Sequence, residues 1–150
     1  MGSIDSTVPR IVSPGEGRVI NFPGLKGEIL LGATQTSGQF MISTITVEPG
    51  SGPSMHQHEF EDEVYVLLDG EVEFKVGDKV QRAGPGTAVW LPRRLPHGWK
   101  VVGDVPATLV NVLTGGNFEE FLMASASAIA SGDRTKVNEL SKLHGVRYLD

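Results

Sequence analysis

The 150-residue chain contains no cysteine, so it can form no disulfide framework and can offer no thiolate to a metal. It also lacks any apolar run near the roughly 20 residues that a membrane-spanning helix needs. No basic segment followed by an apolar core opens the sequence, so no signal peptide is predicted and a cytoplasmic location is expected. The net charge is −5 and Arg93-Arg94 is the one cationic cluster, which argues against nucleic acids and membranes as partners.

The composition that is present is typical of a soluble globular domain, with 39% hydrophobic and 21% charged residues. A chain of this length is expected to form a single domain with its own core. Residues 1–17 are rich in Ser, Pro and Gly and are interpreted as an N-terminal arm. Residues 18–114 are predicted to form the main domain, and residues 115–150 a C-terminal tail.

Turn residues divide the main domain into short β-branched segments, which predicts an all-β fold of antiparallel strands in a sandwich or barrel. Asp69-Gly70 and Gly77-Asp78 are typical of hairpin turns between such strands. The predicted strands are Glu28–Thr34, Gln39–Val47, Val64–Leu68, Val72–Val76, Thr87–Leu91, Gly98–Val102 and Ala107–Leu113.

The tail changes to a helical period and is predicted to form two short helices packed on the barrel. Asn117 followed by Glu120 has the spacing of a capping box, Asp133 is a second candidate N-cap, and Gly145 is a candidate C-cap. His144 is interpreted as a surface or capping residue. One face of the first helix is predicted to carry Phe118, Phe121, Leu122, Ser125 and Ile129.

Three of the four histidines lie in or near one constellation with a glutamate: His56, His58, Glu63 and His97. His56 and His58 share a face if their segment is extended, because side chains alternate along a strand. Neutral imidazoles with a carboxylate suit a divalent transition metal such as Fe, Mn, Ni, Co, Cu or Zn. We therefore predict one such metal as the cofactor, and because imidazoles must be neutral to ligate, its binding should weaken in acid.

The surrounding residues form two spaced motifs, Gly50-x5-His56-x-His58-x4-Glu63-x6-Gly70 and Gly86-x5-Pro92-x4-His97. These motifs resemble the two signature motifs of the cupin superfamily over roughly residues 39–113. Further stretches are similar to small single-domain cupins of the quercetinase type: Gly52-Pro53, Asp62-Glu63, Leu68–Glu71, Gly84–Gly86 and Gly116–Phe121.

The resemblance implies a double-stranded β-helix, or jelly-roll barrel, with His56, His58, Glu63 and His97 converging on one metal. Glu63 would lie on the strand after the two histidines, and His97 would approach from across the barrel. Such a ligand set leaves coordination positions open, as catalytic sites require. Two residues depart from the family pattern: Arg94 replaces a glycine, which predicts a strained or different turn, and Val101 replaces an asparagine.

The acids near the motif have a less specific interpretation. Glu59, Glu61 and Asp62 are predicted to be solvated loop residues, and Asp62 would replace Glu63 as a ligand only if the intervening bend were one residue shorter.

Alternation also suggests pocket residues. Tyr65 would share the inward face with Glu63, and Trp99 with His97. On the strand before the first motif, the inward set is either Phe40/Ile42/Thr44 or Met41/Ser43/Ile45, so Phe40 and Met41 are both candidates.

Three functional hypotheses follow. The first is a quercetinase-like dioxygenase acting on an aromatic or polyketide-like substrate, with Glu63 and His97 as candidate catalytic residues. The second uses the same pocket for a non-oxidative isomerisation, cyclisation, dehydration or decarboxylation, with or without the metal. The third is a small-molecule-binding protein without enzymatic activity. A homodimer is expected, because exposed strand edges need covering and the N-terminal arm could pair with a neighbour's sheet.

Overall fold

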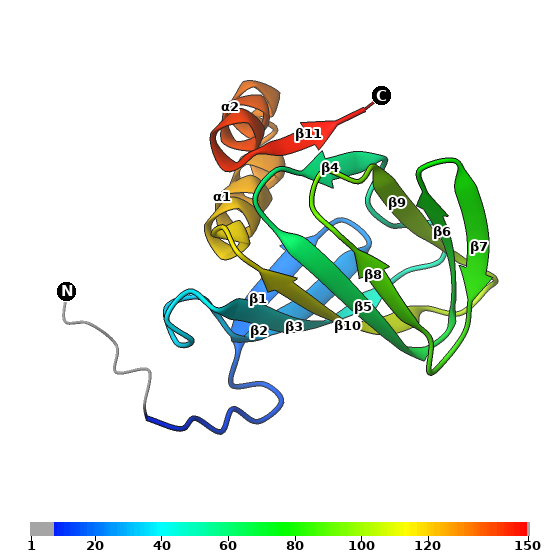
Figure 1. Ribbon diagram of the computed structural model, residues 1–150, viewed down its shortest axis with the longest axis horizontal. Coiled ribbons are helices and arrows are strands. Elements are labelled where there is room, and N and C mark those ends of the chain that lie inside the picture. Colours follow the sequence, from blue (N-terminus) through cyan, green and yellow to red (C-terminus); the bar gives the residue numbers. More distant parts are fainter. Residues whose placement is uncertain (1–7, 150) are drawn as a thin grey trace.

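The computed structural model describes residues 8–149, which form two antiparallel sheets facing each other in a jelly-roll barrel (Figure 1). The all-β prediction is confirmed. The six-stranded sheet has the order β1 (Arg18–Phe22), β2 (Leu25–Leu31), β3 (Phe40–Val47), β10 (Ala107–Thr114), β5 (Asp62–Asp69), β8 (Ala88–Leu91). The five-stranded sheet has the order β11 (Val146–Tyr148), β4 (His56–His58), β9 (His97–Val102), β6 (Glu71–Val76), β7 (Lys79–Ala83).

The core lies between the sheets because alternate residues of their long strands point inward. On β10 the inward positions include Leu109 and Leu113, with exposures of 0% and 1%, and the alternating positions Val110 and Val112 are only partly buried. β10 pairs with β3 on one side and with β5 on the other, which makes it the central strand of its sheet. The same alternation settles the open question on β3: Met41, Ser43 and Ile45 face inward, and Phe40 faces away.

Four of the described strands were not predicted as separate strands: β1, β4, β7 and β11. β4 is only three residues long and is defined by its pairing with β11 and β9, which are distant in sequence. Non-local pairing of this kind leaves little trace in a local pattern.

One of the two predicted hairpin turns is wrong. Gly77-Asp78 does connect the paired strands β6 and β7. Gly70 instead carries the chain from β5 in one sheet to β6 in the other, and it does so with φ of 81°. A side chain at Gly70 would collide with the backbone of Pro106 and Ala107, so this position combines a positive φ with close packing.

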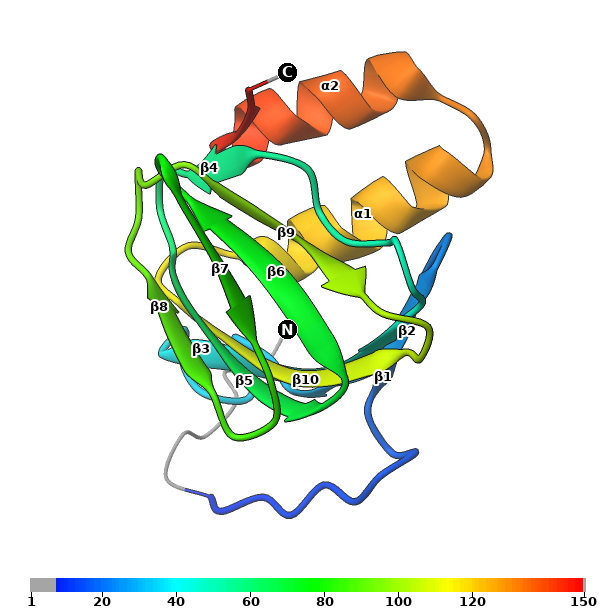
Figure 2. The same ribbon diagram turned by 90° about the vertical axis from the view of Figure 1, so that its right-hand side faces the viewer.

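The tail contains two helices, α1 (Phe118–Ala130) and α2 (Arg134–His144), which lie across the barrel end formed by β4 (Figure 2). The predicted caps are confirmed: Asn117 accepts from the Glu120 amide, Asp133 accepts from the Lys136 amide, and Gly145 adopts the left-handed conformation. Neither helix in the described part of the chain is long and apolar enough to cross a membrane.

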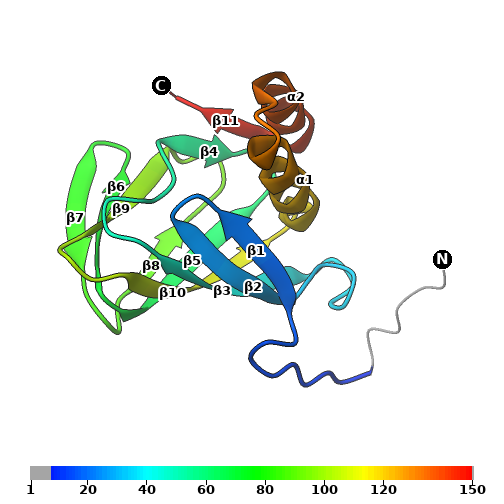
Figure 3. The same ribbon diagram turned by 180° about the vertical axis from the view of Figure 1, so that it is seen from behind.

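The prediction of a purely helical tail is wrong at its last element. After α2 the chain returns to the barrel as β11, whose Val146 pairs with His58 and whose Tyr148 pairs with His56. The view from behind shows β11 beside β4 and the β1–β2 hairpin next to α1 (Figure 3). The tail is therefore fastened to the strand that carries two of the candidate ligands. Residues 1–7 of the expected arm lie outside the described residues.

Candidate metal centre

The four predicted ligands meet inside the barrel. His56, His58, Glu63 and His97 are all buried, and one potential ligand atom from each lies within 4.8 Å of the others. His56 and His58 share the inward face of β4, as predicted from their spacing. His97 stands directly opposite His56 on the neighbouring strand β9. Glu63 lies on β5 in the other sheet.

The expected placement of His97 across the barrel is therefore wrong. The three histidines occupy adjacent strands of one sheet, and the carboxylate is the group that approaches from across the barrel. Nε2 of His97 lies 3.1 Å from Oε1 of Glu63, and Nε2 of His58 lies 3.9 Å from the same oxygen. The ring centroids of His56 and His97 are 4.4 Å apart. The donors thus surround a small common volume between the sheets.

Two of the histidine rings are oriented by backbone carbonyl groups. Nδ1 of His56 lies 2.6 Å from the Ser54 oxygen, and Nδ1 of His97 lies 3.0 Å from the Leu95 oxygen. A carbonyl oxygen can only accept, so both rings carry a proton on Nδ1, and Nε2 on the interior side is the atom that can bind a metal when the ring is neutral. Contacts of this kind are what orient metal-binding imidazoles.

The third ring has a carboxylate in the corresponding position. Oε2 of Glu61 lies 3.5 Å from Nδ1 of His58, and Glu61 is only 1% exposed. The prediction that Glu61 is a solvated loop acid is therefore wrong. Its position just before β5 turns it inward, because the chain there bends to bring Glu63 to the barrel interior. A buried carboxylate beside a ligand histidine is a second group that orients the ligand set.

The junction between β10 and α1 makes room for Glu61. A Cβ at Gly116 would collide with the Glu61 carboxylate, and a Cβ at Gly115 would collide with the Phe60 carbonyl oxygen. Gly115 and Gly116 both have positive φ. This glycine pair therefore lets the chain pass close to the Phe60–Glu61 bend on its way to the helices.

Glu63 is held from two sides. Oε2 accepts a hydrogen bond from Nδ2 of Asn111 at 3.0 Å, and Oε1 faces His97. Burial by itself raises the pKa of Glu63, but the hydrogen bond from His97 and the charges of the three imidazoles when protonated leave that pKa below its usual value. Glu63 is therefore a carboxylate at neutral pH.

Asn111 is a site residue that the sequence interpretation missed. It occupies an inward position of β10 between Leu109 and Leu113, and it is only 6% exposed. A single amide at an inward position of an otherwise apolar strand is a recognisable signal, because a buried polar group needs a partner.

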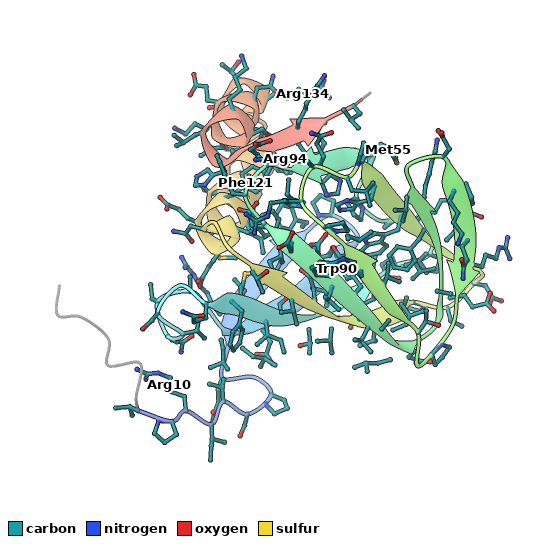
Figure 4. All side chains as sticks on the ribbon, in the orientation of Figure 1. Arg10, Met55, Trp90, Arg94, Phe121 and Arg134 are labelled. Carbon is teal, nitrogen blue, oxygen red and sulfur yellow. The ribbon has the colours of Figure 1, made fainter. Side chains whose placement is uncertain are left out.

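The other two nearby acids are engaged on the outside, as expected for surface groups. Asp62 accepts from the backbone and the guanidinium of Arg93, and these hydrogen bonds lower its pKa. Glu59 pairs with Arg94 at 3.0 Å. Asp62 is therefore not available to replace Glu63. Arg94 has the positive φ of 66° that its replacement of a glycine suggested, and Figure 4 labels it at the barrel end near the helices.

The donor set fits a divalent transition metal. It offers three imidazole nitrogens and one carboxylate, which is the nitrogen-oxygen chemistry that Fe, Mn, Ni, Co, Cu and Zn accept. Both ring nitrogens of His58 are buried without a hydrogen-bond partner among the described residues, and Nε2, 3.9 Å from Oε1 of Glu63, is the one on the side of the other donors. Four protein donors leave one or two coordination positions for a substrate.

The metal site opens into a cavity of about 410 Å³, whose walls are mostly apolar. Ligand cavities typically have volumes in this range. Its barrel side is lined by Ile20, Phe22, Pro23, Leu25, Ser43, Ile45, Gly52, Pro53, His56, His58, Glu63, Tyr65, Trp99 and Asn111. The tail contributes Phe118, Phe121, Leu122, Ser125, Ile129, Val137, Val146 and Tyr148.

Of the four candidate pocket residues, two line the cavity and two do not. Tyr65 and Trp99 line the cavity with ring centroids 5.3 Å apart, and burial raises the pKa of Tyr65 well above its usual value. Met41 points inward but is part of the hydrophobic core and does not line the cavity. Phe40 lies on the outer face of β3, in a separate surface pocket with Leu31.

The predicted apolar face of α1 is confirmed, because all five of its residues line the cavity. Phe118 packs edge-on against the His58 ring at a centroid distance of 5.0 Å. Figure 4 labels Phe121 on α1 at the same end of the barrel. His144 is half-buried, with its ring 5.8 Å from that of Phe121. The tail is therefore one wall of the cavity.

Comparison with known proteins agrees with this architecture. Residues 43–113, which include all four candidate ligands, match the Cupin domain family. The matched region is a cupin domain. It runs from within β3 through β10 and leaves the tail outside it.

Curated relatives match at low identity. Mannose-1-phosphate guanylyltransferase ManC of Salmonella typhimurium is 27% identical over 82 residues, which are 55% of this chain and 17% of the relative. Quercetin 2,3-dioxygenase of Bacillus subtilis is 25% identical over 117 residues, which are 78% of this chain and 34% of the relative. The cupin therefore spans a third or less of the length of these two relatives.

Solved structures share the fold. KdgF from Halomonas sp. superimposes with a TM-score of 0.66 at 18% identity, covering 75% of this chain and 99% of the other. The polyketide cyclase RemF from Streptomyces resistomycificus superimposes with a TM-score of 0.61 at 20% identity, covering 71% and 79%. At these identities the likeness concerns the barrel alone.

Proposed function

We propose that this cupin is a metal-dependent enzyme that acts on an aromatic or polyketide-like small molecule, with a quercetinase-like dioxygenation as its reaction. The observation that carries the proposal is the buried set of three histidines and one glutamate, three of which (His56, His58 and Glu63) line a mostly apolar cavity of about 410 Å³. The similarity to quercetin 2,3-dioxygenase over 78% of the chain supports this reaction class.

In the proposed enzyme, His56, His58 and His97 hold the metal through Nε2, and Glu63 holds it through its carboxylate. When bound, a divalent transition metal supplies Lewis acidity toward an enol or phenol oxygen of the substrate, and redox capacity toward dioxygen. The apolar walls exclude water and suit a flat hydrophobic ring system better than a sugar.

Glu63 has a second role in this proposal, as general base. Its carboxylate is ionised at neutral pH, and Asn111 fixes one of its oxygens by a hydrogen bond of 3.0 Å. The other oxygen, Oε1, would take the proton of the substrate hydroxyl as the substrate enters the site. His97, whose Nε2 lies 3.1 Å from Oε1, would hold the metal beside that oxygen.

The Glu63→Gln variant tests this role. The amide keeps the size of the side chain and removes its basicity, so we expect turnover to fall by about 10²–10⁴-fold, a larger factor than any fall in metal content. Oxygen uptake with flavonol substrates, together with elemental analysis of the purified variant, measures both quantities. Glu59→Gln is the matched control, because Glu59 pairs with Arg94 on the surface and should leave turnover unchanged. Full turnover by the Glu63→Gln variant would contradict the role.

A second candidate is a non-oxidative reaction, such as an isomerisation, cyclisation, dehydration or decarboxylation, in the same cavity. The observation that favours it is that an ionised Glu63, fixed by Asn111 in apolar surroundings, is a base that needs no oxidant. Removal of oxygen separates the candidates: anaerobic incubation stops the dioxygenase and leaves the non-oxidative enzyme active. Activity that survives chelation would select a metal-free variant of the second candidate, and binding without product formation would select a binding protein.

A further inference from the structure

Ser125 in the middle of α1 carries a buried hydroxyl group without a hydrogen-bond partner. The residue is 3% exposed, and its Oγ has no partner among the described residues. Buried serines in helices commonly bond to a carbonyl one turn earlier. Ser141 of α2 does so, donating to the Val137 oxygen at 2.9 Å. Ser125 is the buried helical serine that does not.

No described residue gives the Ser125 hydroxyl group a hydrogen-bond partner. Ser125 lines the cavity on the wall built by the tail, where Tyr148 is the one other lining residue with a polar side-chain group and the rest are apolar: Phe118, Phe121, Leu122, Ile129, Val137 and Val146. A hydroxyl group removed from water without a partner destabilises the protein. A polar atom kept in such a position is therefore expected to serve a bound molecule.

Ser125 stands far from the metal centre within the same cavity. Phe118, at the start of α1, packs against the His58 ring, which places that end of the helix at the ligand set. Ser125 follows seven residues later, which is about 10 Å along the helix axis at 1.5 Å per residue. A molecule that touches both the metal centre and Ser125 is therefore elongated, with polar groups near its two ends.

We propose that Ser125 is a substrate-recognition residue whose hydroxyl group hydrogen-bonds to a hydroxyl or carbonyl oxygen at the end of the substrate remote from the metal. This inference rests on the proposed function and narrows its substrate class to elongated aromatic compounds with a second polar group. The competing explanation is that Ser125 is a small residue that lets α1 and α2 pack closely. Alanine serves that purpose equally well, so Ser125→Ala separates the two explanations.

The test uses two flavonols that differ by one hydroxyl group at the end remote from the chelating oxygens, 3-hydroxyflavone and 3,4′-dihydroxyflavone. Their dissociation constants are measured by calorimetric titration of the full chain loaded with Zn²⁺, which is redox-inert and so prevents oxidative turnover. A neutral hydrogen bond in an apolar site corresponds to roughly a 5–10-fold change in affinity. We expect the wild-type protein to prefer the dihydroxy compound by about that factor.

Ser125→Ala should abolish this preference by weakening binding of the dihydroxy compound about 5–10-fold, with less than about a twofold change for 3-hydroxyflavone. Ser141→Ala is the matched control, because its hydroxyl is already bonded within α2, and it should keep the preference. Thermal unfolding of both variants verifies that the tail is folded.

Three outcomes would overturn the inference, and they are distinguishable. A preference that persists in Ser125→Ala shows that another group of the protein hydrogen-bonds to the second hydroxyl of the flavonol. Equal wild-type affinities for the two flavonols show that no group of the protein does so, and they leave the proposed function intact. Absence of binding by either flavonol overturns the inference together with the aromatic substrate class.

Discussion

Each histidine of the ligand set has an oxygen atom near its Nδ1, and the chemical group that supplies this oxygen differs between them. His56 and His97 face backbone carbonyl oxygens, which are neutral and cannot be removed by substitution. His58 faces the Glu61 carboxyl group at 3.5 Å, without a hydrogen bond, and this side chain is open to substitution. A carboxylate in this position raises the basicity of the imidazole and so strengthens its bond to a metal. Glu61 is therefore the side chain through which affinity for the metal can be tested without altering a ligand.

At the residue scale we predict that Glu61→Gln weakens metal binding by about 10–100-fold, the usual cost of losing such a contact. The amide keeps the volume that packs on Gly116 but removes the carboxyl group beside His58. Titration of the metal-free protein with Zn²⁺ or Ni²⁺ measures the affinity. Glu59→Gln, on the exposed side of the same bend, should bind as the wild type does. Equal affinity in both variants would show that Glu61 serves packing alone.

At the scale of elements, the loop before β4 passes unusually close to β9. Gly52 has φ of 150°, and a Cβ there would collide with the Trp99 carbonyl oxygen. The same loop is tied to β9 by hydrogen bonds from the Trp99 amide to the Pro53 oxygen and from the Val101 amide to the Ser51 oxygen. This approach holds β4 next to β9 and so brings His56 opposite His97.

Gly50 and Gly52 can be compared to test the close contact between this loop and β9. Both have positive φ, but a Cβ at Gly50 would meet open space. We predict that Gly52→Ala lowers the free energy of unfolding by about 2–3 kcal/mol more than Gly50→Ala, because only Gly52 has the collision and its φ of 150° suits an L-residue less well than the φ of 79° at Gly50. Urea unfolding of the two variants measures the difference. Equal losses would mean that the loop can move away from β9 without cost.

At the scale of the whole molecule, burial of the ligand set makes stability depend on pH. Burial, followed by the positive charge that His97 can carry, lowers the pKa of His56 to about 4. The unfolded chain therefore binds a proton at this residue below about pH 6.5, before the folded protein does. The pKa of Glu63 is also lowered in the fold, which adds a loss of stability at lower pH.

We predict that the metal-free protein loses up to about 3 kcal/mol of stability through His56 as the pH falls from about 6.5 to about 4. Urea unfolding at pH 7, 5.5 and 4.5 measures the loss. His56→Asn, which cannot take up a proton in this range, should show a smaller dependence. A wild-type stability that is constant between pH 7 and 4.5 would contradict the burial of His56 as a neutral ring.

The barrel has strand edges at which a second copy could pair, so the predicted homodimer stays a proposal. Among the described residues the sheets end at β1 and β8 and at β11 and β7, and Trp90 on β8 is 59% exposed. Exposed edges are places where a second copy can pair. Sedimentation equilibrium gives the mass in solution, and a monomer would reject the proposal.

The sequence alone was sufficient for features that depend on near neighbours. His56 and His58 share a face because side chains alternate along any strand, and both helices begin where Asn117 and Asp133 can cap the following turn. The motif spacing further predicted the barrel and the four ligands, since the whole string of glycines, histidines and Glu63 is specific to one family.

Only the tertiary structure decided the features that depend on contacts between residues far apart in the sequence. Alternation says which residues share a face, but it does not say which face is inside, so it left Phe40 and Met41 as equal candidates. The placement of His97 beside His56, the inward turn of Glu61 and the contact between Asn111 and Glu63 all arise from strands that are far apart in the chain. The unpaired hydroxyl of Ser125 became visible for the same reason, because its lack of a partner is a property of the folded wall around it.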